Sequence, residues 1–233
     1  MAGSSATSHL RPVIWNVPQT WEGSAAAAVS QVMDRDRQTS RTAGHRAPAV
    51  LPPPCGRAEN VRLADGTPVR VEPLRRGDRG TVKRLFDRLT PESRMRRFLS
   101  PRSALSDRDL TFLADVGRTG HEAVAALDAR DGSVIGIARY VQHQGRPEAA
   151  DVAVAVADDV HRRGIGSLLM DRLVTCARAN GFDLLTATTL WENRPARALL
   201  KSTGFHAIAS AGAEIELELD LEGLDAAGAG RGS

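Results

Sequence analysis

The chain has 233 residues, of which 42% are hydrophobic and 25% are charged, proportions typical of a soluble globular protein. Lys and Arg total 31 against 28 Asp and Glu, and this net charge of +3 is too small to indicate nucleic acid binding. No segment approaches the ~20 apolar residues that a membrane-spanning helix requires. We therefore expect neither nucleic acid nor a membrane as a partner. The N-terminus also lacks the pattern of a signal peptide.

The two cysteines lie in different sequence contexts. Cys55 follows a run of prolines, and Cys176 lies in an amphipathic segment. Their spacing matches no metal-binding motif, so we expect no metal site and a location in the reducing cytoplasm.

Composition divides the chain into a domain and two tails. Residues 1–58 are rich in Ala, Ser, Thr, Gln and Arg and end in "APAVLPPPCGR", which predicts a flexible N-terminal tail. Trp15 and Trp21 in this tail either dock on the domain or a partner, or have no structural consequence. Residues 222–233 form a second flexible tail, which leaves 59–221 as the folded domain.

The first half of the domain begins with a predicted hairpin, "VRLADGTPVRVEPL", which turns at Asp65-Gly66. A helix is predicted in "GDRGTVKRLFDRLT", where apolar residues recur at helical spacing and Pro91 ends the pattern. A second helix begins at Ser106, whose spacing to Asp109 resembles a capping box. Three predicted strands follow: "EAVAALDA", "SVIGIARYVQ" and "ADVAVAVA".

The second half alternates helices and strands. A long amphipathic helix is predicted from Ile165 to Gly181, followed by the strand "LLTATTL". Asn193 and Pro195 then open another helix, and "EIELELDL" alternates as a last strand. The order predicts a mixed α/β domain whose sheet is mostly antiparallel at its start, unlike a doubly wound fold.

The segment "HRRGIGSLL" places two glycines beside positive charge at the start of a helix. Leu169 stands where a dinucleotide fingerprint needs its third glycine, and Gly166 is not followed by the lysine of a P-loop. Backbone amides from Arg162 to Ser167, freed at a helix start, are suited to bind an anion. The alternative is a tight strand-to-helix turn that needs glycine for its conformation alone.

This segment, together with "ENRPARALLKSTGF", resembles the GNAT family of acyl-CoA-dependent N-acetyltransferases. The family signature is Q/R-x-x-G-x-G/A opening a helix after a strand, followed by an Asn that opens the next helix and Gly-Phe at its end. The matching residues are Gly164, Gly166, Asn193, Gly204 and Phe205, while His161 replaces the first signature residue. "PESRMRRFLSP" and "LSDRDL" are similar to the subgroup that includes bacterial protein lysine acetyltransferases.

The resemblance implies the GNAT fold, acetyl-CoA as cosubstrate without a metal, and direct transfer of acetyl to an amine. The pyrophosphate of coenzyme A is expected on the glycine turn. The expected cosubstrate-binding residues are Val154, Val156, His161, Arg162, Arg163, Gly164, Ile165, Gly166, Ser167 and Asn193.

The resemblance also implies a general base, because a lysine amine with a pKa of about 10.4 is mostly protonated at neutral pH. The family commonly places a Glu at the start of the fourth strand, and the matching residue is Asp151. Its shorter side chain favours a bridging water. The reserve candidates are Glu122, Glu148, His121 and His143.

Two further roles follow from the family. Ala155 is expected to donate its backbone amide to the acetyl carbonyl. The tyrosine that serves many members as general acid is replaced by Leu200, and the only tyrosine, Tyr140, lies in another strand, so no side-chain acid is assigned.

Ten basic residues lie between Arg75 and Arg102. They form either a solvated helix face or a positive wall that favours an acidic partner or the 3′-phosphate of coenzyme A. The acceptor that the subgroup implies is a protein lysine, and small amines are the alternative. A non-catalytic acyl-CoA sensor is the alternative function, and the sequence leaves monomer and homodimer open.

Overall fold

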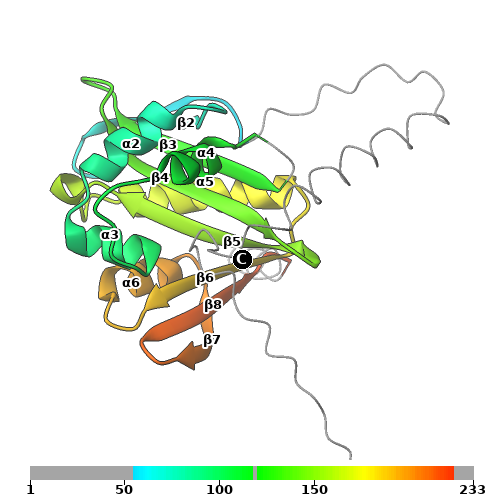
Figure 1. Cartoon of the computed structure of the whole chain (residues 1–233). Coiled ribbons are helices and arrows are strands. Elements are labelled where there is room, and N and C mark those ends of the chain that lie inside the picture. Colours follow the sequence, from blue (N-terminus) through cyan, green and yellow to red (C-terminus); the bar gives the residue numbers. More distant parts are fainter. Residues whose placement is uncertain (1–54, 118–119, 223–233) are drawn as a thin grey trace, which may run out of the picture.

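The structure is a computed structural model that describes residues 55–117 and 120–222. An eight-stranded sheet forms its centre, with helices on both faces (Figure 1). The strand order is β1-β2-β3-β4-β5-β6-β8-β7. The strands are β1 (Glu59–Arg62), β2 (Pro68–Pro73), β3 (His121–Asp128), β4 (Val134–His143), β5 (Arg146–Val156), β6 (Leu184–Leu190), β7 (His206–Ala211) and β8 (Glu214–Asp220). The helices are α2 (Arg79–Asp87), α3 (Pro91–Phe98), α4 (Asp107–Ala114), α5 (Ile165–Ala179) and α6 (Arg194–Ser202), with the short 3-10 helix η2 (Asp158–Val160) before α5.

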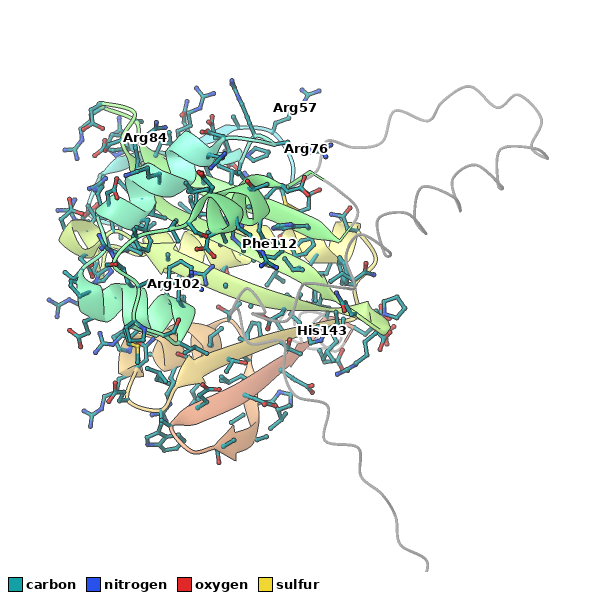
Figure 2. All side chains as sticks on the ribbon, viewed as in Figure 1. Arg57, Arg76, Arg84, Arg102, Phe112 and His143 are labelled. Atoms are coloured by element: carbon teal, nitrogen blue, oxygen red, sulfur yellow. A yellow bond between two sulfur atoms is a disulfide. The ribbon has the colours of Figure 1, made fainter. Side chains whose placement is uncertain are left out.

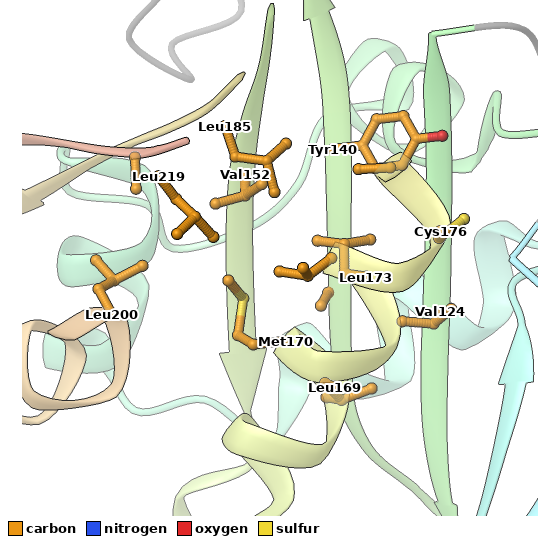
Figure 3. Close-up of a cluster of buried hydrophobic side chains, with 14 of the residues drawn as sticks. Val124, Tyr140, Val152, Leu169, Met170, Leu173, Cys176, Leu185, Leu200 and Leu219 are labelled. Atoms are coloured by element: carbon orange, nitrogen blue, oxygen red, sulfur yellow. The ribbon is translucent and has the colours of Figure 1, made fainter. Parts of the chain in front are cut away.

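The sheet separates two hydrophobic clusters. On one face, α5 and α6 cover β3–β6 and β8, and Leu169, Met170 and Leu173 of α5 are completely buried there (Figure 3). On the other face, α2, α3 and α4 pack their apolar side chains against β3 and β4. Successive residues of a strand point to opposite faces. In β5, therefore, Val152 points toward α5 and Ala155 toward α2–α4.

Most predicted elements are confirmed. The first hairpin turns at Gly66 with a φ of +82°, and Ser106 and Asp109 form a complete capping box at α4. The strand before α6 and the cap of that helix at Asn193 also match the prediction.

Two elements were missed. Pro91 does not simply end a helix, because it is the first residue of α3, and the Thr90 side chain accepts a hydrogen bond from the Ser93 amide. Proline suits a first helical position because its missing N–H would have no helical partner there. Strand β7 was also missed, since its side chains are all exposed and show no alternation of burial.

Strands β5 and β6 diverge, and this positions the site. They are parallel and pair only over Ala149–Asp151 with Leu184–Thr186. Both strands continue beyond this point, β5 to Val156 and β6 to Leu190. The sheet therefore opens between them directly after Asp151.

The two cysteines form a disulfide across a sequence separation of 121 residues. Cys55, just before β1, reaches Cys176 in the C-terminal half of α5, and both residues are buried. The two cysteines, which lie in different sequence contexts, therefore form a buried disulfide, and they no longer support the expectation of a reducing cytoplasm. Sequence spacing could not show this pairing, because only the fold brings the start of the domain against α5.

Residues 1–54, including Trp15 and Trp21, and residues 223–233 lie outside the described part. Over residues 55–117 and 120–222, no helix has the length and apolar character needed to cross a membrane.

Candidate active site

A cleft of about 900 Å³ lies between the diverging ends of β5 and β6. Residues of α3, of the N-terminal turn of α5 and of α6 form its remaining walls. A second hollow of about 720 Å³ lies over β1, β2 and the end of β3, and it contains none of the residues expected at the site.

The N-terminus of α5 opens onto this cleft without a side-chain cap. Gly164 occupies the cap position with a φ of +85°, and the residue two before it, Arg162, also has a positive φ of 62°. The other four α-helices of the described part each have a side-chain cap, namely Asp78, Thr90, Ser106 and Asn193. The first amides of α5 are therefore left to an external acceptor, and the helix dipole favours an anion there.

The two glycines serve different purposes. A β-carbon at Gly164 would meet no atom within 4 Å, so glycine is needed there for its left-handed backbone. A β-carbon at Gly166 would lie 3.1 Å from Cδ2 of Leu199, so this glycine lets α5 and α6 approach closely. The turn therefore has a structural need for glycine, and its uncapped amides also have the geometry that the anion interpretation requires.

The expected cosubstrate residues largely come together at the cleft. Those that line it are Val154, Val156, His161, Arg162, Gly164, Ile165, Gly166, Ser167 and Asn193. Arg163 does not, because it lies 3.7 Å from the carboxylate of Asp65, outside the cleft. Arg96, Arg97 and Arg194 line the cleft although the sequence did not single them out for it.

Two expected residues are held by local hydrogen bonds. Nε2 of His161 lies 3.0 Å from the carbonyl oxygen of Val156 and 3.5 Å from the carboxylate of Asp158. The Asn193 side chain caps α6 by accepting from the Ala196 amide at 3.3 Å, and its Nδ2 donates to Thr189 Oγ1 at 3.2 Å. Asn193 therefore both caps α6 and lines the cleft.

The ladder between β4 and β5 determines which amides of β5 face the cleft. The Ala157 amide donates to the Ile135 carbonyl on the β4 side at 2.9 Å. In an antiparallel ladder, alternate residues direct their backbone groups to the same neighbour. The amide of Ala155 therefore points to β4, and those of Val154 and Val156 point to the cleft. The expectation that Ala155 donates to the acetyl carbonyl does not fit this register.

Asp151 is not among the residues that line the cleft; it directly precedes Val152, the first residue of β5 that does. Its side chain is 7% exposed and accepts a hydrogen bond from Thr186 Oγ1 at 3.1 Å. Burial lowers the pKa of Arg97 on α3 to about 10, and the negative charge of Asp151 opposes that shift. Asp151 is therefore a buried carboxylate with a positive charge nearby, one residue before the part of β5 that lines the cleft.

The reserve candidates for a base are dispersed. Glu122 is buried and faces α5 beside Tyr140, on the opposite side of the sheet from Asp151, and burial raises its pKa to about 7. Glu148 is exposed and forms an ion pair with Arg146 at 3.5 Å. His121 stacks against Phe112 of α4. His143 is linked to Asp151 through the hydroxyl of Thr186.

Leu200, which occupies the position where many family members have a tyrosine as general acid, lines the cleft. Tyr140 lies in the core beneath α5, where its hydroxyl accepts from Asn180 Nδ2 at 2.9 Å (Figure 3). No tyrosine of the described part lines the cleft.

The basic run from Arg75 to Arg102 is mostly engaged in ion pairs. The pairs are Arg76–Asp115, Arg79–Asp107, Lys83–Asp87, Arg88–Asp159, Arg96–Glu92 and Arg102–Asp109. Arg76 and Arg84 of this run point outward from the helical layer (Figure 2). The run is therefore largely a set of surface contacts, and only Arg96 and Arg97 of it line the cleft. Among residues 55–117 and 120–222, no group of three His, Cys, Asp or Glu side chains could hold a metal ion.

Two diverging strands and an uncapped helix N-terminus around one cleft define the class of acyl-CoA N-acyltransferases. The chain belongs to the acetyltransferase (GNAT) family, which matches residues 84–205. It is 35% identical over 147 residues to the acetyltransferase PA5475 of Pseudomonas aeruginosa, covering 61% of this chain and 77% of that protein. It is 30% identical over 147 residues to the acetyltransferase Pat of Mycolicibacterium smegmatis, covering 62% of this chain but only 43% of that protein.

Solved structures have the same fold. The GNAT domain of S. lividans PAT matches with a TM-score of 0.65 at 24% identity, over 70% of this chain and 96% of that domain. The putative acetyltransferase yncA of Salmonella typhimurium, solved with its cofactor acetyl-CoA, matches with a TM-score of 0.55 at 17% identity, over 66% and 94% of the two chains. The protein is therefore a GNAT acetyltransferase with the family's mixed α/β fold.

Proposed function

We propose that the protein transfers the acetyl group of acetyl-CoA to a primary amine, with Asp151 as the general base. The observation that carries this proposal is the position of Asp151. It is a buried carboxylate at the point where β5 and β6 diverge, next to the first cleft residue. Bound acetyl-CoA would supply the activated acyl group.

The cleft suits a phosphorylated cosubstrate. The uncapped amides at the start of α5 offer hydrogen-bond donors to a pyrophosphate, and Arg96, Arg162 and Arg194 add positive charge along the walls. We assign Arg163 to the ion pair with Asp65 instead.

The base is needed because only about one lysine amine in a thousand is neutral near pH 7.4, a deficit of roughly 4 kcal/mol. Asp151 would take the proton directly or through a water molecule. The backbone amide of Val154, which the ladder directs into the cleft, is the proposed donor to the thioester oxygen as negative charge develops on it. With Leu200 at the tyrosine position, the thiolate of coenzyme A would leave without a side-chain acid.

The acceptor that we propose is a lysine side chain of a protein. The similarity to Pat and the segment "PESRMRRFLSP", which contains the whole of α3 beside the cleft, support it. Trp191 would lie near the bound protein, since it is 56% exposed and stacks with Arg197, at the end of β6. Small amines are the alternative acceptors, because one fold serves many substrates.

The test is thiol release from acetyl-CoA with a panel of small amines, lysine peptides and folded proteins. Acceleration by a protein or peptide lysine, traced to acetyl-lysine by mass spectrometry, would support the proposal. If only a small amine is turned over quickly, the acceptor is a small amine and not a protein lysine. Tight acetyl-CoA binding by calorimetry, without turnover of any acceptor, would instead establish an acyl-CoA sensor.

A further inference from the structure

Three polar side chains from three adjoining strands form a continuous hydrogen-bonded chain that begins at Asp151. Thr186 of β6 lies 3.1 Å from the Asp151 carboxylate through its Oγ1. The same hydroxyl lies 2.8 Å from Nε2 of His143, the last residue of β4. The register places Asp151 opposite Thr186 and next to Val141, so all three side chains point to the face that carries α3 and α4.

The two ends of this chain differ in their exposure. Asp151 is 7% exposed, whereas His143 is half-buried at the end of the sheet where β4 turns into β5 (Figure 2). The chain thus leads from the buried carboxylate to the surface.

We propose that Thr186 and His143 relay the proton that Asp151 takes from the amine, so that the imidazole is its terminal acceptor. This inference rests on the proposed role of Asp151 as the base. An aspartate alone, with an ordinary pKa of about 3.9, is poorly matched to an amine of about 10.4. A base with a pKa nearer the operating pH is more effective, and an imidazole coupled to the carboxylate supplies one.

Each proton that moves in the relay can be followed from the amine to solvent. In the receiving state Asp151 is ionised and accepts from the Thr186 hydroxyl, as in the structure, and the neutral His143 carries its ring proton on Nδ1. When the amine gives a proton to Asp151, the Thr186 hydroxyl turns to donate to Nε2 and the protonated Asp151 donates to Oγ1. Thr186 then passes its own hydroxyl proton to Nε2 and takes the proton of Asp151 in its place. The carboxylate is then ionised again and the imidazolium releases one proton to solvent.

The surroundings of His143 keep it neutral near pH 7. Burial lowers its pKa below the ordinary 6.5, and the positive charge of Arg146 acts in the same direction. Glu148 on β5 and Glu218 on β8 oppose the shift. The net effect leaves an unprotonated ring at neutral pH, which the relay requires.

The experiment follows kcat/KM for the acceptor amine as a function of pH in the full-length protein. In the wild type we expect kcat/KM to fall on the acidic side of the profile with a pKa below 6.5. This acidic limb should have the same pKa as the His143 ring measured by NMR titration. In His143→Gln and Thr186→Val, the limb should move down to the range of a carboxyl group and the plateau should fall roughly 10²-fold. Thr186→Ser keeps the hydroxyl and should retain the wild-type limb. His206→Gln, on the exposed strand β7, is the matched histidine control.

The outcomes separate the relay from the base. If Asp151→Asn is inactive but His143→Gln keeps the wild-type limb, the relay is wrong and the base proposal stands. A fall in rate without movement of the limb in Thr186→Val and His143→Gln would also overturn the relay, because it would mean that these residues only hold Asp151 in place. If Asp151→Asn has wild-type activity, both proposals fail. Unchanged circular dichroism spectra and unchanged KM for acetyl-CoA would exclude misfolding.

Discussion

Gly166 of α5 and Leu199 of α6 are so close that a β-carbon on the glycine would lie 3.1 Å from the leucine Cδ2. The contact joins the two helices that form adjacent walls of the cleft. The width of the cleft at the start of α5 therefore depends on the packing of the Leu199 side chain against the Gly166 backbone as well as on the glycine turn.

Gly166→Val should weaken acetyl-CoA binding by roughly 10-fold or more, because overpacking that costs about 1–3 kcal/mol would displace α6 or the first turn of α5. Isothermal calorimetry measures the affinity. The double variant Gly166→Val/Leu199→Ala restores the space and should recover part of the loss. If the losses of affinity from the two substitutions simply add in the double variant, the contact between Gly166 and Leu199 does not determine the width of the cleft.

Gly164→Ala tests the conformational role of the other glycine. At a φ of +85°, a β-carbon costs about 1–2 kcal/mol, so the variant should unfold at a lower temperature and bind acetyl-CoA more weakly. Gly212→Ala, at a φ of +59° in the distant β7–β8 turn, is the control that loses stability alone. If the wild type and both variants bind acetyl-CoA with equal affinity, the turn at Gly164 does not bind the phosphates of coenzyme A.

Asp151→Asn should lower kcat by about 10²–10⁴-fold, because it removes the proposed base while conserving shape. Affinity for acetyl-CoA should change little, and raising the pH should recover part of the rate, since more amine is then neutral. Steady-state thiol release between pH 6 and 10 measures both effects. A wild-type rate at neutral pH would transfer the role to another group.

The raised pKa of Glu122 predicts that the stability of the protein depends on pH. Its pKa is about 7 in the folded protein and 4.5 as the ordinary value, because burial disfavours the ionised form. Below pH 4.5 both states carry the proton; as the pH rises from 4.5 to 7 the unfolded state ionises first, so stability falls by up to about 3 kcal/mol. Glu122→Gln should therefore be more stable than the wild type above pH 7 and lack this decline. Urea unfolding at a series of pH values would show it, and parallel curves for the two proteins would contradict it.

The Cys55–Cys176 disulfide should make stability depend on redox state. It closes a long loop between the start of the domain and α5, and such cross-links typically stabilise by about 2–4 kcal/mol. A reductant should lower the unfolding temperature of the wild type and leave that of Cys55→Ser unchanged. Two free thiols in protein isolated under alkylating conditions would show that the bond is not formed.

The sequence alone determined the features that depend on local chemistry. The capping box at Ser106, the turn at Gly66 and the glycine-containing start of α5 follow from backbone preferences within a few residues, and the family resemblance rests on the same short segments. The cleft residues on this turn were predictable because they are contiguous.

The tertiary structure alone decided the relationships between distant segments. The direction of the Ala155 amide depends on its ladder with β4, and the ion pair of Arg163 depends on the first hairpin. The hydrogen-bonded chain of His143, Thr186 and Asp151 requires three strands in one register, and the disulfide requires the chain before β1 to reach α5. Sequence periodicity gives the face on which a side chain lies, but pairing between strands and contacts between helices decide its neighbours.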